Sequence, residues 1–230
     1  MEFRSQVYLK IMHAGHGCGT GQMWTGARRS RWGTLRVMRV FGIDCGTEIT
    51  GFGVVESDEE SRNPRLICRA FGAIRLSKQK TMPQRLKQVF DELNAALDQW
   101  QPDVVAVEEV FYSVNAKSAL KLGQVRGVAL LAVARMGLPL AEYAPLKIKS
   151  SVVGYGMASK EQVQFMVARL LELECEPEPA DAADALAIAI CHIHTAQTLA
   201  AQSIVAPTVP PAIRTQTAAA SIRKQLQELR

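Results

Sequence analysis

Four carboxylate side chains lie at the ends of apolar stretches that are expected to be buried. Asp44 ends the otherwise apolar stretch 40–43, Glu108 ends the stretch 104–107, and Asp181 and Asp184 open a run of alanine, leucine and isoleucine. A carboxylate at such a place is costly to desolvate unless it is paired or bound to a cation. No lysine or arginine is adjacent to these acids in the sequence. The four together predict a site for a hard divalent cation.

The chemistry that such a site supports is metal-assisted hydrolysis of a phosphodiester. Two Mg²⁺ ions roughly 4 Å apart, with Mn²⁺ as a substitute, can activate a water and stabilise the leaving oxygen. In this interpretation Asp44 bridges the two ions. Each acid also has an ordinary explanation: Asp44 can stabilise a turn, Glu108 can be a surface residue, Asp181 can cap a helix, and Asp184 can complement the helix dipole. The combination is what favours the metal.

The elements that must hold these acids are legible from the hydrophobic pattern. Three strands with short connections predict an antiparallel start, and strands alternating with helices follow. Asp181 and Asp184 are three residues apart, so they share one face of their helix. The predicted fold class is α/β, with a mixed five-stranded sheet flanked by helices. We expect strands at 39–44, 51–56, 65–75, 103–107 and 138–143, and helices at 83–100, 115–136, 160–173 and 181–196.

Charge divides the chain into three parts. Residues 1–37 carry a net charge of +5 and residues 199–230 a net charge of +3, whereas residues 38–198 hold 17 basic and 20 acidic residues. We therefore predict an N-terminal extension over 1–37, disordered or preceding the true start at Met38. A nuclease domain over 38–198 and a flexible tail over 199–230 complete the chain. Because the central part is acidic, any nucleic acid must bind to a local patch.

Cysteine usage and hydropathy bear on the compartment. Five scattered cysteines without CxxC spacing favour a reducing compartment. No stretch reaches the roughly 18 uncharged apolar residues of a membrane span. The expected location is the cytoplasm, with no membrane partner.

Four motifs in order resemble one family. Arg39-Val-Phe-Gly-Ile-Asp44-Cys-Gly-Thr is similar to the opening of the RuvC family of Holliday junction resolvases, and Val107-Glu-Glu-Val-Phe111 with Asn115-Ala-Lys-Ser-Ala is similar to its second motif. Ser151-Val-Val-Gly-Tyr-Gly with Ser159-Lys-Glu-Gln-Val resembles the third motif. Ala180-Asp-Ala-Ala-Asp184 resembles the last. Together these motifs span about residues 38–196.

The resemblance implies a ribonuclease-H-like fold, a homodimer and Mg²⁺-dependent paired nicking of four-way junction DNA in recombination and repair. It also implies a junction-binding protein and a branch-migration ATPase, of RuvA and RuvB type, as partners. Asp44, Glu108, Asp181 and Asp184 match the family's catalytic acids. The DNA-binding residues expected by position or by spacing are Phe111, Lys117, Lys121, Arg126, Lys149 and Lys160.

The sequence departs from the family at Cys45, where the family usually has proline, and in its first 37 and last 32 residues. Three alternatives stay open. The first is a ribonuclease-H-like nuclease of RNA-processing type. The second is an ATPase of the actin and sugar-kinase type, because the turn after Asp44 resembles their phosphate loop. The third is a catalytically silent DNA-binding protein, although the presence of all four acids argues against it.

Overall fold

A computed structural model describes residues 8–11, 37–58, 65–109 and 116–205. The strands are β1 (Tyr8–Ile11), β2 (Val37–Asp44), β3 (Ile49–Asp58), β4 (Leu66–Arg75), β5 (Val104–Glu108) and β6 (Leu140–Tyr143). The helices are α1 (Met82–Trp100), α2 (Ala116–Arg135), α3 (Pro145–Val153), α4 (Lys160–Leu170) and α5 (Ala180–Val205).

The strands form one mixed sheet in the order β1-β4-β3-β2-β5-β6. Strands β2, β3 and β4 pair antiparallel, as their short connections require, and β1 pairs antiparallel with β4. Strands β2, β5 and β6 are parallel, and helices connect them. The predicted mixed sheet is confirmed, with β1 as a sixth strand from the segment that the sequence assigns to the extension.

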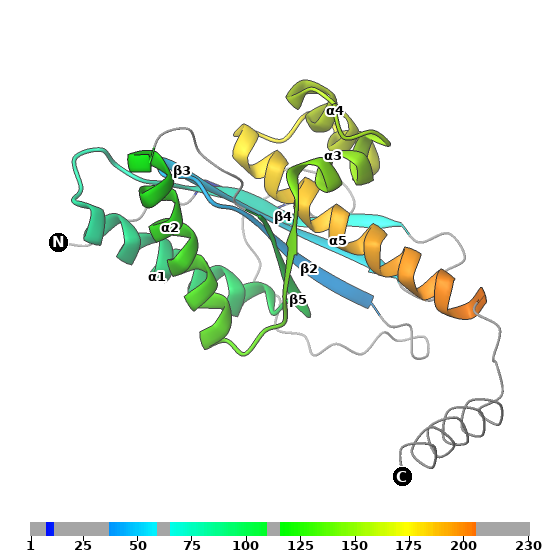
Figure 1. The fold of residues 1–230 in the computed structure, drawn as a ribbon, viewed down its shortest axis with the longest axis horizontal. Helices are drawn as coiled ribbons and strands as arrows, with labels where there is room; N and C mark the ends of the chain where they lie inside the picture. The colour runs from blue at the N-terminus through cyan, green and yellow to red at the C-terminus, as the bar shows by residue number, and fades with distance from the viewer. Residues whose placement is uncertain (1–7, 12–36, 59–64, 110–115, 206–230) are drawn as a thin grey trace, which may run out of the picture. The chain divides into compact units, whose positions relative to one another are not determined.

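Helices cover both faces of this sheet, and strand alternation decides which side chain faces which helix (Figure 1). Phe41 and Ile43 of β2 pack into a core shared with α1 and α2. Val40, of the opposite parity, packs into a second core that contains residues of α3, α4 and α5. By the same alternation Asp44 points to the face that α5 covers.

Glycines let α5 lie unusually close to the sheet. A Cβ atom on Gly42 would stand 2.0 Å from the carbonyl oxygen of Ala185, and one on Gly51 would stand 1.9 Å from that of Asp181. Gly53 is crowded by the Leu186 side chain in the same way. Glycine is the only residue without a Cβ, so at these positions the backbone of α5 can lie directly against the strands.

Apart from the additional strand β1, the predicted elements correspond to observed ones, and the main differences lie in three helices. Helix α3 was not predicted. Helix α5 runs on to Val205, nine residues beyond its predicted end. Helix α4 ends at Leu170, three residues before its predicted end. The division into extension, nuclease domain and tail stays a prediction.

Candidate active site

The first two acids lie side by side because β2 and β5 are parallel and in register. Ile43 pairs with Val107, so the next residues along, Asp44 and Glu108, end neighbouring strands at the same edge. Because side chains alternate along a strand, each acid lies on the same face of the sheet as the residues that pack toward α5. The Thr50 hydroxyl donates to the carbonyl oxygen of Gly46 at 3.2 Å and closes the turn that follows Asp44.

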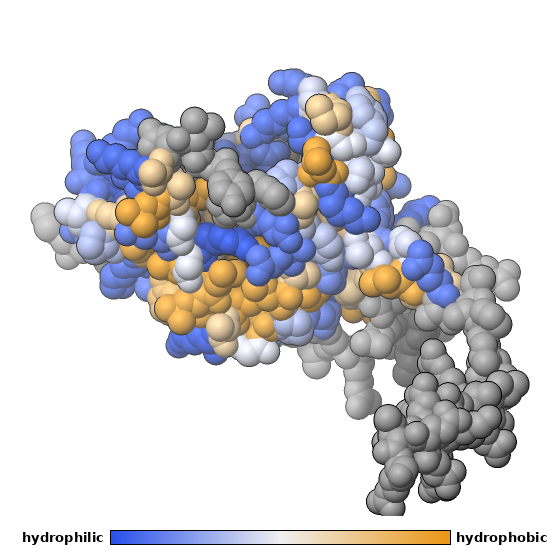
Figure 2. All heavy atoms as spheres, viewed as in Figure 1, coloured by the Kyte–Doolittle hydropathy of each residue, from blue (hydrophilic) through white to orange (hydrophobic). Residues whose placement is uncertain are grey.

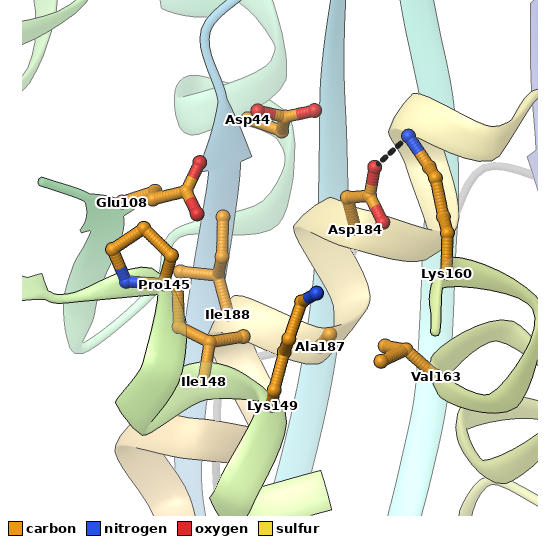
Figure 3. A pocket seen from close by; sticks show the side chains of 10 residues that line it. All are labelled: Asp44, Glu108, Pro145, Ile148, Lys149, Lys160, Val163, Asp184, Ala187 and Ile188. Atoms are coloured by element: carbon orange, nitrogen blue, oxygen red, sulfur yellow. Dashed lines mark ion pairs between the residues drawn. The ribbon is translucent and has the colours of Figure 1, made fainter. Parts of the chain in front are cut away.

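The other two acids reach this edge from the first turns of α5. Ala182, Ala183 and Ala185 are fully buried, and Asp181 and Asp184 stand between them, half-buried. Figure 3 shows the Asp44, Glu108 and Asp184 carboxyl groups facing a common space from two strands and a helix. Three elements distant in sequence thus supply one acidic cluster.

This common space is a pocket of about 200 Å³. Its charged lining consists of Asp44, Glu108, Asp184, Lys149 and Lys160. Its apolar lining comes from α3, α4 and α5, and consists of Pro145, Ile148, Val163, Ala187 and Ile188. Asp181 is not part of the lining, yet its charge raises the pKa of both Asp44 and Asp184.

Burial and mutual repulsion make these carboxylates difficult to ionise together. Burial, followed by the charges of Asp184, Glu108 and Asp181, raises the pKa of Asp44 to about 7. Burial and Asp184 also raise the pKa of Glu108, against the opposing charges of Lys160, Lys149 and Arg126. Carboxylates that suppress one another's ionisation attract any cation that can enter.

Lys160 forms an ion pair with one of these acids, Asp184. Its Nζ lies 2.6 Å from Oδ2 of Asp184, and the ammonium is about half exposed. The hydrogen bond to Asp184 raises the pKa of Lys160 and opposes the rise in the pKa of Asp184. The Lys160 ammonium is therefore fully charged at neutral pH. Asp44 and Glu108 form no ion pair among the described residues.

The donor set fits a divalent cation in its chemistry. Carboxylate oxygens are the ligands that Mg²⁺ and Mn²⁺ prefer, and burial together with three neighbouring acids raises the pKa of Asp44. Within the described part of the chain, however, no three His, Cys, Asp or Glu side chains are placed so that they could hold an ion as they stand. Oδ2 of Asp184 is engaged by Lys160. Binding a metal therefore requires Asp184 to leave Lys160 or the acids to rotate.

Five of the six predicted DNA-binding residues fall into three groups. Lys149 and Lys160 line the pocket, where Nζ of Lys149 donates to the carbonyl oxygen of Ala158 at 2.9 Å. Lys117 and Lys121 are exposed in the first turns of α2. Phe111 lies outside the described residues.

Arg126 is placed differently from the lysines. Its Nη1 donates to the carbonyl oxygen of Glu108 at 2.6 Å, and its Nη2 forms an ion pair with Glu142. The side chain is only 12% exposed. A contact of Arg126 with DNA stays a prediction, but the structure turns its guanidinium toward β5 and β6.

Sequence reasoning missed the contribution of α3. Pro145 begins this helix and Ile148 and Lys149 reach the pocket from it. Pro145 at a first helical position was the available signal. It was obscured because the helix has only nine residues and ends in two valines.

Comparison with known proteins gives a consistent result. The sequence pattern of one family, described as Crossover junction endodeoxyribonuclease RuvC, matches residues 40–192. A protein of that name from Acidobacterium capsulatum is 68% identical over 168 residues, which are 72% of this chain and 98% of the relative.

Solved structures of RuvC are similar to this chain as well. Thermus thermophilus RuvC is 33% identical, with a TM-score of 0.64 over 70% of this chain and 96% of that chain. The structure of T. thermophilus RuvC in complex with Holliday junction substrate gives the same TM-score and coverage at 30% identity. In the described part of the chain, no helix is long and apolar enough to cross a membrane.

Proposed function

Because this chain belongs to the RuvC family, we infer that it is a metal-dependent crossover junction endodeoxyribonuclease with a ribonuclease-H-like fold. Its substrate is four-way junction DNA, which it resolves by paired, symmetric nicks. The observation that carries this inference is the convergence of Asp44, Glu108 and Asp184 on one pocket at the edge of the sheet.

The roles of the acids follow from their places. Asp44, whose pKa is raised by burial and by all three other acids, lies at the centre of the negative charge. We propose that Asp44, Glu108, Asp181 and Asp184 would hold two Mg²⁺ ions, or their Mn²⁺ substitutes, as catalytic ligands. When bound, the ions supply water activation and stabilisation of the leaving oxygen.

Lys149 and Lys160 provide positive charge at the same pocket. A phosphodiester that enters between them meets one ammonium from α3 and one from α4. We propose that both lysines bind the scissile phosphate and stabilise charge that develops on it. Lys117 and Lys121 on α2 are proposed to contact the DNA backbone further away, and Phe111 to stack on an unpaired base.

Paired nicking requires two active sites, and we propose a homodimer. The exposed face of α2 is suited to the contact, because Leu120 and Leu131 are 66% and 58% exposed and lie on the same side of the helix. Figure 2 shows apolar side chains gathered over the C-terminal half of α2. We further propose the cytoplasm as location and junction-binding and branch-migration proteins of RuvA and RuvB type as partners.

The experiment that tests the function compares cleavage of a synthetic four-way junction with cleavage of a matched linear duplex. We expect symmetric nicks in the junction alone, in Mg²⁺ or Mn²⁺ and not in EDTA. Asp44→Asn should abolish nicking and keep junction binding, because it removes one charge and little volume. Binding without cutting by the wild type would favour a silent relative, and cutting of RNA substrates alone would favour the RNA-processing alternative.

A further inference from the structure

The guanidinium of Arg126 joins the ends of two neighbouring parallel strands. It donates to the carbonyl oxygen of Glu108, the last residue of β5, and pairs with the carboxylate of Glu142 in β6. Residues Val107 and Glu142 are opposite one another in the β5–β6 register. One planar group therefore links the strand that carries a catalytic acid to the strand beside it.

Helix geometry explains why Arg126 does this and the lysines of the same helix do not. At about 100° per residue, Arg126 lies on the opposite side of α2 from Lys117, nine positions earlier. Lys117 and Lys121 are exposed, whereas Arg126 is half-buried by residue and its side chain is 12% exposed. The lysines form one face of α2, and Arg126 belongs to the face that meets the sheet.

The backbone at Glu108 is held at two points. The N–H of Glu109 donates to the carbonyl oxygen of Tyr143 at 2.8 Å, and the Glu108 carbonyl oxygen accepts from Arg126. The orientation of this peptide determines where the Glu108 carboxyl group points.

We propose that Arg126, anchored by Glu142, is a positioning residue that holds the main chain from which Glu108 reaches the metal site. This assignment rests on the proposed function of the site. It differs from the role predicted from the sequence, in which Arg126 contacts a DNA phosphate. Residues that orient metal ligands affect metal affinity about 10-fold to 100-fold in other proteins. A lysine cannot replace Arg126, because a single ammonium does not reproduce two divergent N–H donors held in one plane.

The test measures metal binding and DNA binding separately. We expect Arg126→Lys to weaken Mn²⁺ binding to the free protein by about 10-fold in calorimetry. We expect cleavage to need correspondingly more Mn²⁺ and to recover at saturating metal. Junction affinity in EDTA, and its dependence on salt, should not change. Glu142→Gln should shift metal affinity in the same direction by a smaller factor, and it tests the anchor if Arg126→Lys does not fold.

Lys121→Met is the matched control on the same helix. Loss of a phosphate contact there should reduce the salt dependence of junction binding by about one unit of log–log slope and leave Mn²⁺ affinity unchanged. If Arg126→Lys instead shows this Lys121 pattern, Arg126 is a phosphate contact and the positioning role is overturned. If the wild type binds Mn²⁺ but does not cut junctions, the proposed function fails, whereas the calorimetric result for Arg126 still stands.

Discussion

At the scale of single residues, the site is a balance between carboxylates that repel one another and the few cations near them. Asp44 is held next to three other acids by strand register and helix placement. Lys160 forms an ion pair with Asp184, and its charge also opposes the rise in the pKa of Asp44 and Glu108. The folded chain therefore retains electrostatic repulsion that a bound cation relieves, which couples metal binding to stability.

Stability should fall with rising pH because of Asp44. Its pKa is raised from 3.8 to about 7, so between these values the folded chain holds a proton that the unfolded chain has lost. The contribution of this proton is full below about pH 4 and is gone above about pH 7. In EDTA, we expect Asp44→Asn to be more stable than the wild type at pH 8, by on the order of 2–4 kcal/mol, and nearly equal to it at pH 4.

Urea unfolding at the two pH values measures this difference. Adding Mg²⁺ at pH 8 should stabilise the wild type more than Asp44→Asn, since the variant lacks a ligand. A stability difference between wild type and variant that is the same at pH 4 and pH 8 would show that Asp44 is not the group that titrates.

Removing Lys160 should separate metal binding from catalysis. Because its ammonium occupies Asp184 Oδ2, Lys160→Gln frees that oxygen for an ion. We expect Mn²⁺ to bind the variant without DNA at least as tightly as the wild type, while junction cleavage falls about 100-fold because charge stabilisation at the phosphate is lost. Calorimetry and single-turnover cleavage give the two numbers. Weaker Mn²⁺ binding by the variant would show that Lys160 does not compete with the metal for Asp184.

At the scale of elements, the closeness of α5 to the sheet determines whether the acids converge. Gly51 allows the carbonyl group of Asp181 to lie against β3, and Gly42 does the same for Ala185 on β2. The two acids of the helix reach the strand acids only at this short separation. A shift of α5 moves Asp181 and Asp184 together and leaves Asp44 and Glu108 behind.

Gly51→Ala tests this dependence. The new methyl group cannot fit where a Cβ would lie 1.9 Å from the Asp181 oxygen, so the helix must move away from the strand. We expect a loss of about 1–3 kcal/mol in the free energy of unfolding, measured with urea, and a loss of at least 10-fold in cleavage. Cleavage at the wild-type level would mean that the acids tolerate a displaced helix.

Elements and acids could be predicted from the sequence to different extents. The strand ends at Asp44 and Glu108 follow from apolar runs interrupted by an acid, because burial is a property of each strand's own pattern. The role of Arg126 could not be predicted. It depends on which side of α2 faces β5 and β6, and this tertiary packing leaves no signal in the local sequence. Contact of Lys160 with Asp184 was inaccessible for the same reason.

At the scale of the whole molecule, the strand order places β1 away from the strands that carry the site. Strand β1 lies at one edge of the sheet, whereas Asp44 and Glu108 end β2 and β5, and β4 and β3 stand between β1 and β2. The pairing of β1 with β4 covers an edge and contributes no residue to the pocket. We therefore expect the described part of this segment, β1, not to affect the chemistry of the pocket.

Deleting residues 1–37 should leave junction cleavage within about twofold of the full-length value, because the effects of distant surface changes are small. The thermal midpoint should fall slightly, since β4 loses a neighbouring strand. Cleavage kinetics and thermal unfolding of the truncated chain check both statements. A truncated chain that folds but does not cut would show that the N-terminal segment acts on the site.

The order in which the acids occur along the chain has a consequence for the cell. Asp44 and Glu108 are synthesised first, whereas Asp181 and Asp184 lie in α5, the last helix described. A ribosome making this protein therefore releases most of the sheet before the second half of the acidic cluster exists. We expect nascent chains and premature termination products that end before α5 to be unable to cut DNA. On the proposed assignment of the acids, the late position of α5 would keep unfinished chains from acting as nucleases.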